Sequence, residues 1–297
     1  MGKIQDALDK LRPEAPEPLS GQSPLVSAST LETAVDRNGI SAAGFVQLDE
    51  DLLREKGLLP EAATAAELSQ QYRRVKRPLL RQVFTTYPVS VNETGRVLLV
   101  ASALRGEGKT FTSMNIAQAI AIEPELQVLL IDGDAPKQGL TSAFGLDGKP
   151  GLLDLVEDRS MATSSVVYKT SQEGLFFMPA GARRNNSPEL LGSSRAQRIV
   201  SELARRSGPC VVIIDSPPVL LANEARALSS AADNTLFIVR AGSTSTGQVD
   251  AALESIGSTE NVYVLLNQSP SAGASDYKYG YGYGYGVTAD DSATRGG

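Results

Sequence analysis

The chain has 297 residues, enough for one large domain or two small ones. Its formal net charge of −6 argues against general nucleic-acid binding. It contains no histidine, which excludes histidine metal ligands, histidine general bases and serine–histidine triads. The single cysteine, Cys210, cannot form an internal disulfide, which fits a reducing cytoplasm. No apolar run reaches the roughly 20 residues that a membrane helix needs. The sequence therefore predicts a soluble cytoplasmic protein that reaches a membrane only through a partner.

The residues ahead of the core differ in composition along the chain. Residues 1–12 place apolar side chains on one helical face and predict an amphipathic helix, which fits a frayed helix on its own domain and a docking element equally well. Residues 13–44 are rich in proline, serine and acidic residues, which predicts a disordered linker. The main domain is expected at 45–272. Its helix at 62–78 is basic near its end and is expected to stop before Pro78, because a proline disfavours helical backbone in the residue ahead of it.

Alternating apolar strands and helices follow, from about residue 84 to residue 270. Several strands are continuous apolar runs, as expected for a parallel sheet covered on both faces. The predicted strands are Val97–Ala101, Val128–Ile131, Leu175–Met178, Val211–Ile214, Thr235–Val239 and Val262–Leu266, with helices near 109–122, 188–206, 221–231 and 246–257. This order predicts a doubly wound, mostly parallel α/β domain, whose ligands bind beyond the carboxyl ends of the strands.

A glycine-rich loop follows the first of these strands. It reads Ala103-Leu104-Arg105-Gly106-Glu107-Gly108-Lys109-Thr110 and leads into a helix. This is the order that a phosphate-binding loop requires, although Ala103 stands where the first glycine is usual. The glycines let backbone N–H groups surround a phosphate, Lys109 can reach the β and γ phosphates, and Thr110 can offer its hydroxyl to Mg²⁺. The loop therefore predicts a nucleotide site.

Three aspartates stand at the same edge of the predicted sheet. Asp132 and Asp134 end one strand, and Asp215 ends another. Each alone fits a helix cap or turn residue equally well, but three beside a phosphate loop favour a metal site, because Mg²⁺ prefers carboxylate oxygens and water. In a chain without histidine, a carboxylate is also the natural acceptor for the proton of a substrate hydroxyl.

The end of the chain is rich in tyrosine and glycine. Residues 273–297 are predicted to be a flexible tail, since alternate glycines and sparse apolar surface cannot offset the entropy of ordering. Five of the nine tyrosines fall here, at Tyr277, Tyr279, Tyr281, Tyr283 and Tyr285. Alone, such a tract fits an inert low-complexity segment or a self-associating one. The phosphate site upstream favours a different interpretation, in which these phenols are substrates.

Taken together, these motifs resemble the bacterial tyrosine kinases of capsule and exopolysaccharide export, P-loop proteins similar to the MinD and ParA ATPases. The resemblance covers roughly residues 62–285. It rests on the Gly-Glu-Gly-Lys-Thr loop, the Asp-x-Asp segment at 132–134, the Ile-Ile-Asp-Ser-Pro-Pro run at 213–218 and the tyrosine cluster. The chain looks like the free-standing cytoplasmic form, and its opening residues and Tyr72–Leu80 look like autokinases of exosortase-linked loci.

The resemblance implies ATP and Mg²⁺ as ligands and assigns roles to the motif residues. Lys109 binds phosphate. The metal is bound by Thr110 directly and has two carboxylates beside it, those of Asp134 and Asp215. Asp132 lies near the incoming phenol. Asn267 lies where related ATPases contact adenine. The remaining nucleotide contacts come from the loop and the start of the helix: Arg105, Gly106, Glu107, Gly108 and Phe111.

The resemblance also implies partners and reveals two departures. The basic helix packs against a neighbouring subunit in a ring through Arg74 and Arg77, but Gln71 stands where the family has glutamate. Pro136 replaces an arginine of the Asp-x-Asp motif, with Lys137 beside it as a substitute cation. The implied partners are further copies of the unphosphorylated chain, a membrane chain-length-determinant or activator protein, and a tyrosine phosphatase.

Three functions fit this pattern. The first is a tyrosine autokinase that phosphorylates its own tail between subunits and regulates exopolysaccharide polymerisation and export. The second is a MinD/ParA-like positioning ATPase, which the tail and the absence of an early loop lysine (Leu104 stands there) disfavour. The third is a nucleotide-binding scaffold without catalysis.

Overall fold

The computed structural model describes residues 42–84, 96–205, 209–257 and 261–269. The predicted N-terminal helix, nearly all of the predicted linker and the whole tail with its five tyrosines lie outside these ranges. Within them, no helix has both the length and the apolar character needed to cross a membrane.

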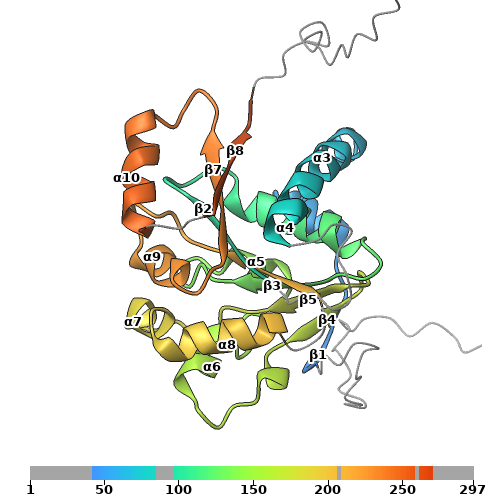
Figure 1. Cartoon of the computed structure of the whole chain (residues 1–297). Helices are drawn as coiled ribbons and strands as arrows, with labels where there is room; N and C mark the ends of the chain where they lie inside the picture. Colours follow the sequence, from blue (N-terminus) through green and yellow to red (C-terminus); the bar gives the residue numbers. More distant parts are fainter. Residues whose placement is uncertain (1–41, 85–95, 206–208, 258–260, 270–297) are drawn as a thin grey trace, which may run out of the picture. The chain divides into compact units, whose positions relative to one another are not determined.

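The described residues form one eight-stranded sheet with the order β1-β4-β5-β3-β6-β2-β7-β8 (Figure 1). All neighbouring strands are parallel except β4 and β5. The six predicted strands all form, each within one residue of its expected ends: β2 (Arg96–Ser102), β3 (Gln127–Asp132), β5 (Leu175–Met178), β6 (Cys210–Asp215), β7 (Asn234–Arg240) and β8 (Val262–Asn267). The predicted doubly wound, mostly parallel α/β fold is confirmed.

Helices cover both faces of the sheet and bury two apolar clusters (Figure 1). Side chains of β2 alternate between them: Leu98 and Val100 join one cluster, and Val97, Leu99 and Ala101 join the other. The first cluster lies under α2 (Glu50–Glu55), α3 (Ala65–Val83), α4 (Lys109–Ala121) and α5 (Gly139–Ala143). The second lies under α6 (Leu152–Glu157), α7 (Ser187–Leu191), α8 (Ser194–Arg205), α9 (Asn223–Ser229) and α10 (Thr246–Ile256).

Several short elements were not predicted from the sequence. At one edge of the sheet, β1 (Gly44–Val46) pairs with β4 (Tyr168–Thr170), which follows a single 3-10 turn at Thr163–Ser165. The strand β1 begins at the last residue of the predicted linker. Helices α2, α5 and α6 are five or six residues long, too short for a helical periodicity to stand out.

The predicted end of the basic helix before Pro78 is wrong. Helix α3 continues through Pro78 to Val83, and its last turns bury Leu79, Leu80 and Val83 in the first cluster. An internal proline costs about 3 kcal/mol, whereas each buried aliphatic side chain contributes roughly 1.5–3 kcal/mol. Tertiary packing therefore outweighs the local preference of the residue before proline.

The single helix predicted at 188–206 is also wrong, because two helices, α7 and α8, occupy this stretch. The break falls at Gly192 and Ser193. The Ser193 hydroxyl donates to the Leu190 carbonyl at 2.7 Å and accepts from the Ala196 N–H at 3.2 Å, so one side chain ends α7 and begins α8.

Candidate active site

The phosphate loop joins the end of β2 to the start of α4. Gly106 and Gly108 have φ angles of +79° and +95°, a left-handed conformation that favours glycine. A Cβ atom on Gly108 would lie 2.1 Å from Asn267 Nδ2, so this position also needs glycine for space. Lys109 begins α4, which places the loop at the N-terminus of a 13-residue helix.

The Lys109 ammonium is buried among loop atoms and carboxylates. It donates to Ser102 Oγ at 2.8 Å and to the Leu104 carbonyl at 3.3 Å. These contacts use two of its three N–H groups in the described structure and leave the third for a phosphate oxygen. Burial lowers the pKa of Lys109, while the charges of Asp215, Glu107 and Asp134 raise it and that of Lys137 lowers it.

Asp132 and Asp215 lie side by side at the carboxyl edge of the sheet. They are paired residues in the register between β3 and β6, and both are almost completely buried. Burial, and after it the charge of Asp132, raises the pKa of Asp215 to about 7. Burial likewise raises the pKa of Asp132 to about 6. The site is therefore rich in carboxylates and short of positive charge, which suits a divalent cation.

Asp132 is anchored by three hydrogen bonds. Its Oδ2 accepts from the N–H and the hydroxyl of Thr141, both at 2.8 Å, and its Oδ1 accepts from the Asp134 N–H at 3.1 Å. The Thr141 hydroxyl in turn accepts from the Ala180 N–H at 3.1 Å, which ties this carboxylate to the loop after β5. Only Oδ1 retains acceptor capacity for a substrate.

The predicted metal-side residues meet in the same region. Asp215 accepts from Ser113 Oγ at 3.0 Å, and a hydrogen bond from the Thr110 side chain lowers the pKa of Asp215. Asp134 is buried and accepts from the Lys137 N–H at 3.2 Å. Across the described residues, no three carboxylate, cysteine or histidine side chains form a metal cage. A Mg²⁺ ion fits this donor set as one held by one or two carboxylates, a hydroxyl, phosphate oxygens and water.

Asn267 and Glu107, both predicted nucleotide contacts, touch each other. Asn267 Nδ2 donates to the Glu107 carbonyl at 2.8 Å, so the end of β8 lies against the phosphate loop. The Glu107 side chain is 2% exposed and accepts from Thr244 Oγ1 and from the Leu104 N–H at 2.5 Å. Arg105 is exposed, and the half-buried Phe111 lies 6.3 Å from the Tyr72 ring.

Four hydroxyl residues of the site were missed from the sequence. Ser113 lies four residues after Lys109 on the same helical face, a spacing that could have revealed it. Thr244 follows β7 at the carboxyl edge, where ligand-binding residues of such sheets gather. Ser102 is the last residue of β2, so its place at the carboxyl edge could also have revealed it. Thr141 has no sequence signal, because its contacts with Asp132 and Ala180 depend on the tertiary fold.

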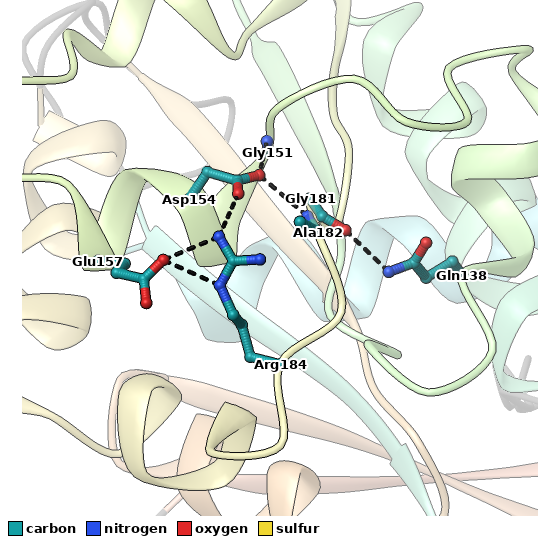
Figure 2. A network of polar contacts seen from close by, with 7 residues as sticks. All are labelled: Gln138, Gly151, Asp154, Glu157, Gly181, Ala182 and Arg184. Carbon is teal, nitrogen blue, oxygen red and sulfur yellow. Dashed lines mark hydrogen bonds and ion pairs between the residues drawn. The ribbon is translucent and has the colours of Figure 1, made fainter.

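The loop after β5 is fixed by the network in Figure 2. The Asp154 carboxylate accepts from the N–H groups of Gly151 and Ala182 at 2.9 and 3.0 Å. Arg184 bridges Asp154 and Glu157 at 2.9 and 2.8 Å. Gln138 Nε2 donates to the Gly181 carbonyl at 2.8 Å, which joins this loop to the turn after β3. The network fixes the loop whose Ala180 N–H donates to Thr141, the residue that holds Asp132.

Helix α3 presents its arginines to the outside. Arg74 and Arg77 are exposed, as is Gln71. The opposite side of the helix is anchored by Tyr72, which is buried, and by Lys76, whose ammonium contacts the Glu123 carboxylate at 2.5 Å. The predicted interface arginines therefore lie on a surface that a neighbouring subunit could reach.

Comparison with known proteins gives consistent matches. The AAA domain family matches residues 95–268. The putative tyrosine-protein kinase EpsB of Ralstonia nicotianae is 33% identical over 179 residues, 60% of this chain and 23% of EpsB. The tyrosine-protein kinase YwqD of Bacillus subtilis is 28% identical over 172 residues, 58% of this chain and 71% of YwqD.

A solved structure extends the match to three dimensions. The VpsO kinase domain superposes with a TM-score of 0.58 at 26% identity, covering 70% of this chain and 100% of that one. The chain spans about a quarter of the length of EpsB, so the likeness is to one part of that protein. These matches confirm the resemblance to bacterial tyrosine kinases predicted from the motifs.

Proposed function

The chain belongs to the AAA domain family, and from this premise we propose that it is an ATP- and Mg²⁺-dependent protein-tyrosine kinase that phosphorylates its own C-terminal tyrosines. One observation carries the proposal. The buried Lys109 ammonium and the paired carboxylates Asp132 and Asp215 converge at one edge of the sheet, in a chain that ends in five clustered tyrosines. Phosphoryl transfer needs mainly positioning and charge stabilisation, which such an arrangement supplies.

Each residue has a distinct role in this proposal. The Lys109 ammonium and the loop N–H groups bind the phosphates, and Asn267 faces the base. Thr110, Asp134 and Asp215 hold Mg²⁺ directly or through water. When bound, Mg²⁺ offsets the negative charge of the phosphate oxygens. The loop at Gly106 and Gly108 surrounds the phosphates and excludes water from them.

Asp132 accepts the proton of the acceptor phenol. Its pKa of about 6 lets it be ionised at neutral pH and still take up a proton. The contacts from Thr141 occupy Oδ2 and hold the carboxylate in place, so Oδ1 is the atom that faces the phenol. The network of Figure 2 keeps the loop after β5 fixed while the acceptor tyrosine enters the site.

The acceptor tyrosines come from a second subunit in this proposal. Residues 273–285 could span at most roughly 45 Å when extended, enough to leave one subunit and enter the next. Tethering makes the phenols locally abundant, so weak recognition of sequence would suffice. The exposed Arg74 and Arg77 on α3 would form part of the subunit contact.

Phosphorylation would then act as a charge switch on assembly. Each phosphotyrosine adds about −1.5 to −2 charges, so five would add roughly −8 to −10 to a chain that is already acidic. The repulsion would dissolve a ring of subunits, and a tyrosine phosphatase would restore it. The kinase would regulate exopolysaccharide polymerisation and export through a membrane activator protein that recruits it to the inner face of the plasma membrane.

Incubation of the purified chain with ATP and Mg²⁺, followed by mass spectrometry, tests the reaction. Phosphotyrosine at 277–285 supports the kinase. Release of free phosphate with an unmodified tail would instead indicate a positioning ATPase, and neither product would indicate a nucleotide-binding scaffold. The Lys109→Met chain, which should yield no product, is the control for contaminating kinases.

Transfer between subunits is tested by mixing two variants. One is a Lys109→Met chain with its full tail, and the other is an active chain truncated after Ala272. Phosphate should appear on the inactive chain, and the rate should rise with protein concentration. Alanine at both Arg74 and Arg77 should slow transfer, as should salt, because exposed ion pairs are screened beyond about 8–10 Å. An inactive chain that stays unmodified at every concentration would rule out transfer between subunits.

A further inference from the structure

A buried carboxylate lies inside the phosphate loop, where a negative charge would repel a phosphate. Glu107 is 2% exposed. Its Oε2 accepts from the Leu104 N–H at 2.5 Å, and its Oε1 accepts from the hydroxyl of Thr244. Burying a carboxylate is costly unless both oxygens are hydrogen-bonded, as they are here. The side chain is therefore turned away from the phosphate position and ties the loop to a second segment.

That second segment is the loop between β7 and α10, and it is itself rigid. The Thr244 N–H donates to the Arg240 carbonyl at 3.1 Å, and the Thr244 hydroxyl accepts from the Arg240 N–H at 3.3 Å. The Ala241 N–H donates to the Asn267 carbonyl at 2.9 Å, which joins this loop to the end of β8. Thr244 thus offers Glu107 a fixed point outside the phosphate loop.

Two side chains at the end of β8 hold the same loop by donating hydrogen bonds to carbonyl groups of the loop. Asn267 Nδ2 donates to the Glu107 carbonyl at 2.8 Å, and Gln268 Nε2 donates to the Gly106 carbonyl at 3.2 Å. In a trans peptide the N–H points opposite to the carbonyl. The N–H groups of Glu107 and Gly108 are therefore turned away from β8 and toward the interior of the loop, where a phosphate would bind.

We propose that Glu107 is a positioning residue. Its contact with Thr244 and the contacts from Asn267 and Gln268 together form a latch, which holds the phosphate loop in the shape that binds a nucleoside triphosphate. The proposal rests on the nucleotide-binding part of the proposed function and is independent of tyrosine transfer. Thr244 acts only through Glu107, and it would affect every ligand that carries the triphosphate, with or without a base.

The test measures binding of ATP and of inorganic tripolyphosphate, each with Mg²⁺, by calorimetry on the full chain. Thr244→Val removes the hydroxyl but keeps the shape of the side chain. It removes the hydrogen bond to the buried Glu107 carboxylate and the one accepted from the Arg240 N–H, and it should weaken both ligands by the same factor, roughly tenfold. Thr244→Ser should restore binding to within about twofold of the original chain. Thr246→Val, the same change at an exposed position of the same segment, is the matched control and should leave binding unchanged.

Glu107→Gln keeps the size of the side chain and provides a second line of evidence. If the two residues act through one contact, Thr244→Val should weaken binding less than about threefold in the Glu107→Gln chain, compared with roughly tenfold in the original chain. Two further measurements decide the alternatives. Weaker ATP binding with unchanged tripolyphosphate binding would mean that Thr244 touches the base or ribose directly, which overturns the latch. A lower melting temperature with unchanged binding of both ligands would overturn it too, whereas an original chain that binds neither ligand would instead refute the proposed nucleotide site.

Discussion

Two pairs of neighbouring carboxylates differ in their partners. Asp154 and Glu157 in the network of Figure 2 share the cation Arg184. The hydrogen bonds that the described structure gives to Asp132 and Asp215 at the phosphate site come from N–H and hydroxyl groups instead. Arg184 contacts both Asp154 and Glu157, and two backbone N–H groups complete the surroundings of Asp154. At the phosphate site, the Lys109 ammonium lies near Asp134 and Asp215, but its hydrogen bonds go to Ser102 and Leu104.

The difference separates carboxylates whose partners stabilise the fold from carboxylates whose burial and mutual repulsion oppose it. A paired carboxylate with complete hydrogen bonds favours the folded state, whereas a buried carboxylate that repels its neighbour destabilises it. The raised pKa values of Asp132 and Asp215 are the signature of the second kind. A free-energy penalty of this kind is typical of functional sites, where charged groups are arranged to bind a ligand and not to stabilise the fold.

Lys109→Met should produce the largest effect of the substitutions, and it tests the phosphate site. Loss of the ammonium should weaken ATP binding by at least about 100-fold, since this buried cation is held inside the phosphate loop by Ser102 and Leu104. Methionine fills a similar volume, so circular dichroism and the melting temperature should hardly change. Calorimetry with ATP and Mg²⁺ measures the first quantity, and retained affinity would show that the loop does not bind phosphate as described.

Asp132→Asn sharpens the comparison within the site itself. If this carboxylate serves the phenol, turnover should fall by roughly 10²–10⁴-fold while ATP affinity changes little. If Asp134 holds Mg²⁺, as proposed, Asp134→Asn should also weaken the dependence on Mg²⁺. Steady-state rates at a series of Mg²⁺ concentrations measure both variants. Identical profiles would mean that the division of roles between the two aspartates is mistaken.

Arg184→Ala breaks the other side of the comparison and should have the smaller effect. The loss leaves Asp154 and Glu157 without their shared partner and should lower the melting temperature by roughly 2–5 °C. ATP affinity should stay within about twofold, because the residues of the network contact one another and not the phosphate loop. Differential scanning calorimetry and ATP titration on one preparation separate the two quantities. A loss of ATP affinity without a loss of stability would place Arg184 in the nucleotide site.

The comparison also shows what could be predicted from the sequence. The strands and Asp132, Asp134 and Asp215 were predictable, because parallel strands are continuous apolar runs and their carboxyl ends carry the ligands. The network of Figure 2 was not, since Arg184 and Asp154 are 30 residues apart and meet only through the tertiary fold. The continuation of helix α3 beyond Pro78 could not be predicted for the same reason, because the packing of the buried side chains after the proline decides it.

The central claim is that one kind of carboxylate destabilises the empty fold and the other stabilises it. Asp215 makes the claim testable by pH. Its folded pKa of about 7 lies above its usual value of 3.8, so ionisation disfavours the folded state. The penalty is absent below the usual value, grows as the pH rises toward about 7 and is constant above it. Neutral asparagine removes it, and Asp154→Asn supplies the matched change in the paired network.

The most direct measurement is the free energy of unfolding of these two variants and the original chain at pH 5 and pH 8, without nucleotide and with a chelator. At pH 8, Asp215→Asn should be more stable than the original chain by roughly 1–3 kcal/mol, and the gain should shrink at pH 5. Asp154→Asn should be less stable by about 1–2 kcal/mol, because it disturbs hydrogen bonds to Arg184, Gly151 and Ala182. Opposite signs at pH 8 would bear out the account. A loss of stability in both variants would contradict it, because the carboxylates of the phosphate site would then be part of what holds the empty protein together.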